Sequence, residues 1–114
     1  MECGCGVNKV HEFKVEADIG ADPIWCNQCG YNLDIEDFKI SKNLEEKLMD
    51  WISQYGKWID WSTDTLMPNA TEMEAIHNAN GEKLTQELAT ELSIEGEVVF
   101  SPSKTVMVYK INKF

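Results

Sequence analysis

Four cysteines are the residues of this chain whose types and spacing could do chemistry. Cys3 and Cys5 form a C-x-C pair, and Cys26 and Cys29 form a C-x-x-C pair twenty residues further along. Closely spaced thiolates converge on one metal ion, and two such pairs supply the four ligands of a closed tetrahedral zinc site. The first residues carry neither the basic nor the apolar segment of a secretory signal, which disfavours a disulfide scaffold. The sequence therefore predicts a structural Zn²⁺ bound by Cys3, Cys5, Cys26 and Cys29.

The second cysteine pair also carries a family resemblance. The stretch Trp25-Cys26-Asn27-Gln28-Cys29-Gly30-Tyr31 resembles the zinc knuckle of zinc-ribbon and rubredoxin-like domains, in which C-P-x-C-G precedes an aromatic residue. Gly30 matches the knuckle glycine, which lets the backbone turn with a positive φ, whereas Asn27 replaces the usual proline. The resemblance covers about residues 3–33 and implies a β-hairpin clipped by zinc.

Three other uses of the thiols stay open. Rubredoxin-type iron also takes four thiolates, but both of its arms are C-x-x-C. A redox pair at Cys26 and Cys29 needs a following helix to lower the thiol pKa, and here Gly30 follows at once. Catalytic zinc needs three protein ligands and an open position. His11 is the nearby alternative ligand, and it lies in an alternating run that is typical of a strand.

The first third of the chain predicts a hairpin followed by a helix. Residues 10–17 alternate apolar and polar side chains, which indicates a half-buried strand, and Ile24 and Trp25 return as its partner. Ser41 can cap a helix that begins at Lys42 and ends or bends at Gly56. That helix has an apolar stripe with helical spacing, made of Leu44, Leu48, Ile52, Tyr55 and Ile59.

The second half predicts more helix and a final hairpin. Thr71 and Glu74 form a capping box, Asn80-Gly81 is a stop signal, and a further helix then ends at Gly96. Residues 98–100 and 106–111, joined by a turn with Pro102, predict a C-terminal β-hairpin. The fold class is therefore α+β: a zinc-clipped N-terminal hairpin, two or three helices and a C-terminal hairpin. Residues 1–40 form the zinc-ribbon-like hairpin, and residues 41–114 form an α+β remainder packed with it as one compact unit.

The charge of the chain limits its partners. It has 10 Lys, no Arg and 20 Asp and Glu, which give a net charge of −10. Such a chain is repelled by phosphate backbones and by anionic membranes. No stretch approaches the ~20 apolar residues of a membrane span. We therefore expect a cytoplasmic protein whose partner is another protein, and the charge favours a basic one.

Convergent catalytic groups are missing from the sequence. The two histidines, His11 and His77, lie in no nucleophile, phosphate-binding or zinc-protease motif. His77 precedes the expected helix end, where the helix dipole favours a cation without any further role. The sequence therefore predicts that the protein is not an enzyme.

Four aromatic residues fall close together, namely Trp51, Tyr55, Trp58 and Trp61. They serve either the core or a partner-binding face, since Trp and Tyr are enriched at binding hot spots. Trp58 and Trp61 lie outside the apolar stripe on a helical wheel and follow Gly56. We therefore predict that both are exposed to a protein partner or to a second copy in a homodimer.

These observations favour a small zinc-binding protein that acts by protein contacts, as an adaptor or regulator. The alternative is an acidic inhibitor or immunity-type protein whose negative surface covers a basic enzyme or nucleic-acid-binding site. A third possibility is a redox or metal-handling enzyme. The identity of the partner would distinguish the first two possibilities. A single basic, nuclease-like partner would favour the inhibitor, and a subunit of a larger machine would favour the adaptor.

Overall fold

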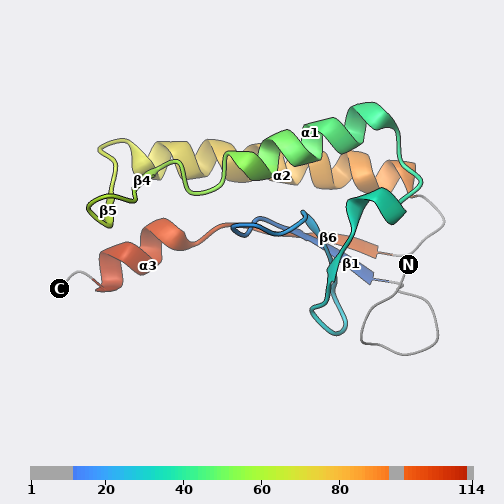
Figure 1. Cartoon of the computed structure of the whole chain (residues 1–114), viewed down its shortest axis with the longest axis horizontal. Helices are drawn as coiled ribbons and strands as arrows, with labels where there is room; N and C mark the ends of the chain where they lie inside the picture. Colours follow the sequence, from blue (N-terminus) through green and yellow to red (C-terminus); the bar gives the residue numbers. More distant parts are fainter. Residues whose placement is uncertain (1–11, 93–96, 113–114) are drawn as a thin grey trace.

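The computed structural model describes residues 12–92 and 97–112. Cys3, Cys5, His11 and the helix end expected at Gly96 lie outside this part of the chain. In chain order, the elements are β1 (Glu12–Glu16), β2 (Ile24–Cys26), β3 (Asn32–Leu33), a 3₁₀ turn (Ile35–Asp37), α1 (Lys42–Ser53), β4 (Ile59–Asp60), β5 (Thr65–Leu66), α2 (Ala70–Glu91), β6 (Glu97–Ser101) and α3 (Thr105–Asn112). Figure 1 shows two layers, with α1 and α2 side by side over one face of the sheet that contains β1 and β6.

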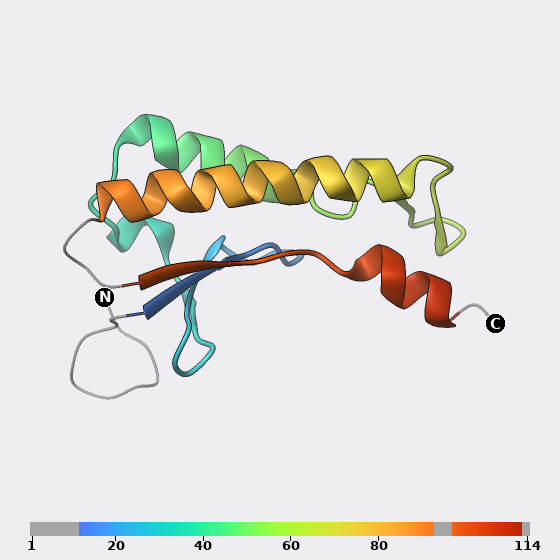
Figure 2. The same cartoon turned by 180° about the vertical axis from the view of Figure 1, so that it is seen from behind.

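The main sheet has the order β3-β2-β1-β6. Strands β1 and β2 are antiparallel with Val15 opposite Ile24, which confirms the predicted N-terminal hairpin. Strand β6 confirms the strand predicted at residues 98–100, but it pairs in parallel with β1, with Phe13 beside Val98. Two segments from opposite ends of the chain are therefore neighbours in the sheet. Seen from behind in Figure 2, α2 crosses above both strands.

The predicted C-terminal β-hairpin is wrong, because residues 106–111 lie in α3. Their β-branched side chains suggested a strand, but tertiary contacts decide the conformation. Val106 is buried in a second small cluster with Trp58, and Tyr109 packs against that cluster from one turn further on. The Oε2 atom of Glu74 accepts the backbone N–H of Val106 at 3.1 Å and so holds the first turn of α3. The Thr71–Glu74 capping box is consequently not formed, and α2 begins at Ala70 without a side-chain cap.

The predicted helix stop at Asn80-Gly81 is also wrong, because α2 runs unbroken from Ala70 to Glu91. Gly81 is buried in the middle of this helix, where a Cβ atom would lie 2.4 Å from the ring of Phe100. The glycine thus serves a close approach between α2 and β6. It does not end the helix.

Helix α1 begins as predicted. The Oγ atom of Ser41 accepts the N–H of Leu44 at 3.1 Å, and Leu44 and Leu48 are buried in the main core. The helix ends at Ser53, and the chain then turns at Gly56, whose φ is 83°. The core joins Phe13 and Ile24 to residues of α1 and α2, and the α+β class is confirmed.

No helix in the described ranges has both the length and the apolar composition needed to cross a bilayer. The cytoplasmic location stays a prediction.

Candidate protein-binding surfaces

The two cysteines that the structure describes lie in different environments. Cys26 is buried in the main core, whereas Cys29 is exposed in the turn between β2 and β3. Gly30 has a φ of 82°, as the sequence predicted, and its N–H donates to the carbonyl of Cys26 at 2.9 Å. Within residues 12–92 and 97–112, no three His, Cys, Asp or Glu side chains are grouped to hold a metal ion.

The two tryptophans predicted to be exposed differ sharply. Trp58 is only 1% exposed, and its Nε1 donates to Thr105 Oγ1 at 2.8 Å, so the prediction of exposure was wrong for this residue. The helical-wheel argument failed because α1 ends at Ser53, before the chain reaches Trp58. Trp61 is 59% exposed as expected, and its Nε1 donates to the carbonyl of Gly56 at 3.2 Å. A binding role for Trp61 stays a prediction.

His77 lies in the interior of α2 because this helix continues well past Asn80-Gly81. Its ring stacks on Trp51 with a centroid distance of 4.6 Å and lies 5.1 Å from the ring of Trp58. Burial lowers the pKa of His77 to about 4, against a smaller opposing effect of Glu74, so the imidazole is neutral at pH 7. Its Nε2 atom is buried without a hydrogen-bond partner in the described part of the structure. The uncharged ring of His77 therefore lines the space between α1 and α2.

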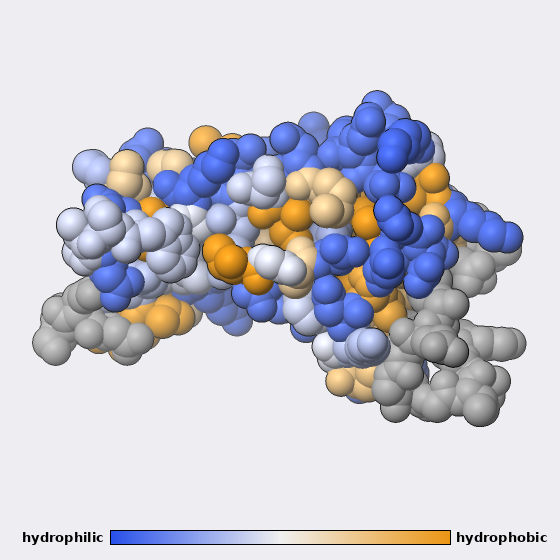
Figure 3. Space-filling model, in the orientation of Figure 1, coloured by the Kyte–Doolittle hydropathy of each residue, from blue (hydrophilic) through white to orange (hydrophobic). Residues whose placement is uncertain are grey.

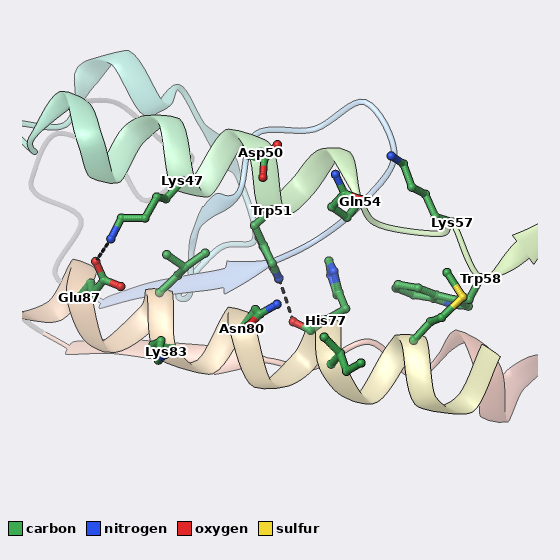
Figure 4. A pocket seen from close by; sticks show the side chains of 13 residues that line it. Lys47, Asp50, Trp51, Gln54, Lys57, Trp58, His77, Asn80, Lys83 and Glu87 are labelled. Carbon is green, nitrogen blue, oxygen red and sulfur yellow. Dashed lines mark hydrogen bonds and ion pairs between the residues drawn. The ribbon is translucent and has the colours of Figure 1, made fainter. Parts of the chain in front are cut away.

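That space is a groove with a volume of about 640 Å³. Its lining includes Trp51, Trp58 and His77. In Figure 4 the side chains of Trp51 and His77 lie between α1 and α2, and that of Trp58 lies beyond the end of α1, next to α2. The Nε1 atom of Trp51 donates to the carbonyl of His77 at 2.9 Å, which fixes the indole across the groove. Ile76 lies at the lip and is 63% exposed. We call this feature the α1–α2 groove.

A second surface is the face of the main sheet that points away from α1 and α2, which we call the open sheet face. Side chains alternate along a strand, so the burial of Phe13 and Val15 under the helices places their neighbours on the other face. In Figures 1 and 2 both long helices lie on one side of the sheet. In the described part of the structure, Val99 of β6 is 40% exposed and the outward residues of β1 and β2 are half-buried, so this face is partly accessible to solvent. Strand pairing and alternation assign to it Glu12, Lys14, Glu16, Trp25, Glu97 and Val99.

The charges on the open sheet face are unevenly balanced. Lys14 forms an ion pair with Glu16 at 3.2 Å, and its Nζ lies 5.7 Å from the ring centroid of Trp25. Glu12 and Glu97 are directly in register on the adjacent parallel strands β1 and β6. Neighbouring strands are about 4.8 Å apart, so these two acidic residues occupy adjacent positions, with Glu12 half-buried and Glu97 exposed. Like charges in such positions are destabilising.

An apolar stripe on α3 lies next to this sheet layer. Val106 and Tyr109 face the interior, so Met107, Val108 and Ile111 lie on the opposite side of the helix, where all three are exposed. Figures 1 and 2 show α3 continuing from β6 at the level of the sheet. In Figure 3 a small patch of apolar surface is visible at the α3 end of the molecule. We call these three residues the α3 stripe.

A protein-family model described as Serratia CdiI immunity protein-like matches residues 11–103. The match spans most of the chain. The chain belongs to this family. Immunity proteins of this family are not enzymes and inhibit a toxin by binding to it. A comparison with curated proteins gave no match.

The family match corrects two predictions and confirms a third. The resemblance to zinc-ribbon domains was wrong, because the matched family is one of immunity proteins and the described residues contain no metal-binding group. The zinc-binding adaptor is accordingly not supported, whereas the alternative of an immunity-type protein is. The prediction that this immunity protein is not an enzyme is confirmed. Zinc binding by Cys3, Cys5, Cys26 and Cys29 is untested, since the first two lie outside the described residues.

Neither the α1–α2 groove nor the open sheet face was predictable from the sequence. The groove residues on α2 were assigned to two separate helices, so their common face was not visible. The alternation at residues 10–17 placed Glu12 and Glu16 on one strand face, but it could not show that Glu97 lies beside them.

Proposed function

We propose that this immunity protein neutralises its toxin by covering a basic surface of the toxin with the open sheet face and the α3 stripe. The family match supports inhibition by binding. The single observation that carries the choice of surface is the in-register pair of carboxylates, Glu12 and Glu97. The net charge of −10 and the absence of Arg favour a basic partner over an acidic one.

The architecture of the sheet supports this choice of face. Parallel strands are normally covered on both faces, because their connections place helices there. In the part of the chain that the structure describes, the parallel pair β1–β6 is covered by α2, and the exposed Val99 marks its other face. A bound partner would supply the missing layer.

The chemistry of this face fits a basic toxin surface. Lys14 already has Glu16 as its partner, so Glu12 and Glu97 remain available to cations of the toxin. A Lys or Arg placed between these two carboxylates would relieve their mutual repulsion and gain two charge-assisted hydrogen bonds. Trp25 and the α3 stripe add apolar area of the kind found at the centres of interfaces.

Three finer points belong to the same proposal. The basic nature of the toxin surface and the absence of nucleic-acid binding both rest on the charge of the chain. A homodimer stays a prediction, with Trp61 as the exposed aromatic residue that could join two copies.

Titration calorimetry of the cognate toxin domain with charge-reversal variants tests the proposal. The double variant Glu12→Lys with Glu97→Lys should bind at least tenfold more weakly, and the deficit should shrink as salt is added. The matched control is Glu46→Lys with Glu82→Lys, which changes the net charge equally at exposed positions on α1 and α2. Equal weakening by both pairs, or by neither, would contradict the assignment of the open sheet face.

A further inference from the structure

The α1–α2 groove lies on the other side of the molecule from the open sheet face. It runs between the two helices that cover the sheet, and the sheet lies behind it in Figure 4. A toxin bound to the open sheet face would therefore leave the groove accessible.

The interior of the groove is suited to a large apolar side chain. Trp51 and Trp58 flank the neutral ring of His77, and the volume of about 640 Å³ is in the range of specific ligand pockets. Ile76 presents most of its side chain to solvent at the lip. This exposed apolar area contributes no hydrophobic stabilisation to the free protein. The same residue would gain by packing against an occupant.

The charges around the groove indicate which charge a bound segment should carry. Lys47 of α1 and Glu87 of α2 close one end with an ion pair at 2.7 Å, visible as a dashed line in Figure 4. Lys57 and Lys83 also line the groove, and neither forms an ion pair with any described residue. Asp50 is the one remaining acidic residue among the described lining residues. In a chain with a net charge of −10, this is a local excess of positive charge.

We propose that the α1–α2 groove is a second protein-docking site, which takes a segment with a large apolar side chain next to a carboxylate. The apolar side chain packs against the exposed Ile76, over the nearly buried rings of Trp51 and Trp58. The carboxylate pairs with Lys57 or Lys83. This chemistry is the opposite of that proposed for the toxin contact, so the site goes beyond inhibition and provides a place for a different acidic partner.

The test uses the full chain, labelled with ¹⁵N, and three blocked hexapeptides observed by NMR. The probes are Gly-Glu-Leu-Phe-Glu-Gly, its basic counterpart Gly-Lys-Leu-Phe-Lys-Gly, and the polar peptide Gly-Glu-Ser-Ser-Glu-Gly. The acidic apolar peptide should shift the indole signals of Trp51 and Trp58 saturably, and the other two should not. No shift with the first peptide, or equal shifts with all three, would overturn the proposal.

Variants distinguish the groove from a general attraction of peptide to protein. Ile76→Ser, and separately Lys57→Glu with Lys83→Glu, should weaken binding of the acidic apolar peptide at least fivefold. The control Lys104→Glu changes an exposed lysine that does not line the groove, and it should leave the affinity unchanged. Unchanged affinity in both groove variants would also overturn the proposal. Because these measurements contain no toxin, and because the groove variants should still bind toxin fully, failure here is distinguishable from failure of the proposed function.

Discussion

Gly81 of α2 lies directly against the ring of Phe100 in β6. A Cβ atom at Gly81 would be 2.4 Å from Cε1 of Phe100 and 2.7 Å from Cζ2 of Trp51, distances that real Cβ atoms do not adopt. The absence of a side chain at this one position therefore lets the long helix sit close to the sheet. The contact also fixes Trp51 at the floor of the α1–α2 groove, so a glycine in the helix interior contributes to the shape of a surface feature.

Gly81→Ala should destabilise the protein even though alanine is the better helix former. The gain in helix propensity is about 1 kcal/mol, whereas forcing a methyl group into a filled site costs about 1–3 kcal/mol. We expect a net loss in the free energy of unfolding, measured by urea denaturation. The loss should be smaller in a Phe100→Leu background, which opens space beside the new methyl group. A more stable Gly81→Ala protein would show that α2 and β6 are further apart than described.

Trp58→Ala and Trp61→Ala should have very different effects on stability. Trp58 is buried and donates a hydrogen bond to Thr105, so its loss should cost about 3–5 kcal/mol. Trp61 is mostly exposed, so its loss should cost about 1 kcal/mol or less. Urea denaturation followed by circular dichroism measures both changes without relying on tryptophan emission. Similar costs for the two variants would mean that Trp58 is not in the core.

The free energy of unfolding should fall as the pH drops through the titration range of His77. Burial lowers the pKa of the folded residue to about 4, from 6.5 in an unfolded chain. Below pH 6.5 the unfolded state therefore binds a proton that the folded state does not, and stability declines until about pH 4. Between pH 7.5 and pH 5 the expected loss is about 2 kcal/mol.

The control for this pH dependence is His77→Phe, which keeps an aromatic ring beside Trp51 but cannot titrate. Hydrogen bonds lower the pKa of Asp60 and of Glu91, and these carboxylates lose their contribution only at still lower pH. They are present in both proteins and cancel in the comparison. If wild-type and His77→Phe proteins lose stability equally between pH 7.5 and pH 5, then His77 is not held neutral by burial.

Glu97→Gln should stabilise the free immunity protein and weaken its binding to toxin. Removing one of two acidic residues at neighbouring positions relieves like-charge repulsion, while it also removes an anionic contact for a basic partner. Thermal denaturation measures the first effect and calorimetry the second. Glu82→Gln makes the same change in net charge on α2 and should affect neither quantity appreciably. Glu97→Gln with undiminished toxin affinity would remove Glu97 from the contact.

Elements that depend on neighbours in the sequence were predictable. Alternation at residues 10–17 indicated β1, and Ser41 indicated the start of α1, because a strand pattern and an N-cap are local signals. The acidic composition likewise allowed the immunity-type alternative to be considered, since net charge is a property of the whole chain.

Elements decided by distant contacts were not predictable. Residues 106–111 have the composition of a strand, and only the bond from Val106 to Glu74, together with the packing of Val106 beside Trp58, explains the helix. Gly81 looked like a helix stop because the sequence does not show Phe100 beside it. The open sheet face was hidden for the same reason, since Glu12 and Glu97 meet only through the parallel pairing of β1 and β6.

Under the proposed function, the parallel pairing of β1 with β6 also sets when a newly made chain can begin to bind toxin. The ribosome makes β1 long before β6, and β6 cannot pair until residue 101 has left the exit tunnel. Contacts between segments so distant in the sequence form slowly in folding. Under the proposed function, a nascent or prematurely terminated chain would therefore lack one half of its carboxylate pair and leave the cell sensitive to toxin. Only chains translated past β6 would add to the amount of protein that can bind toxin.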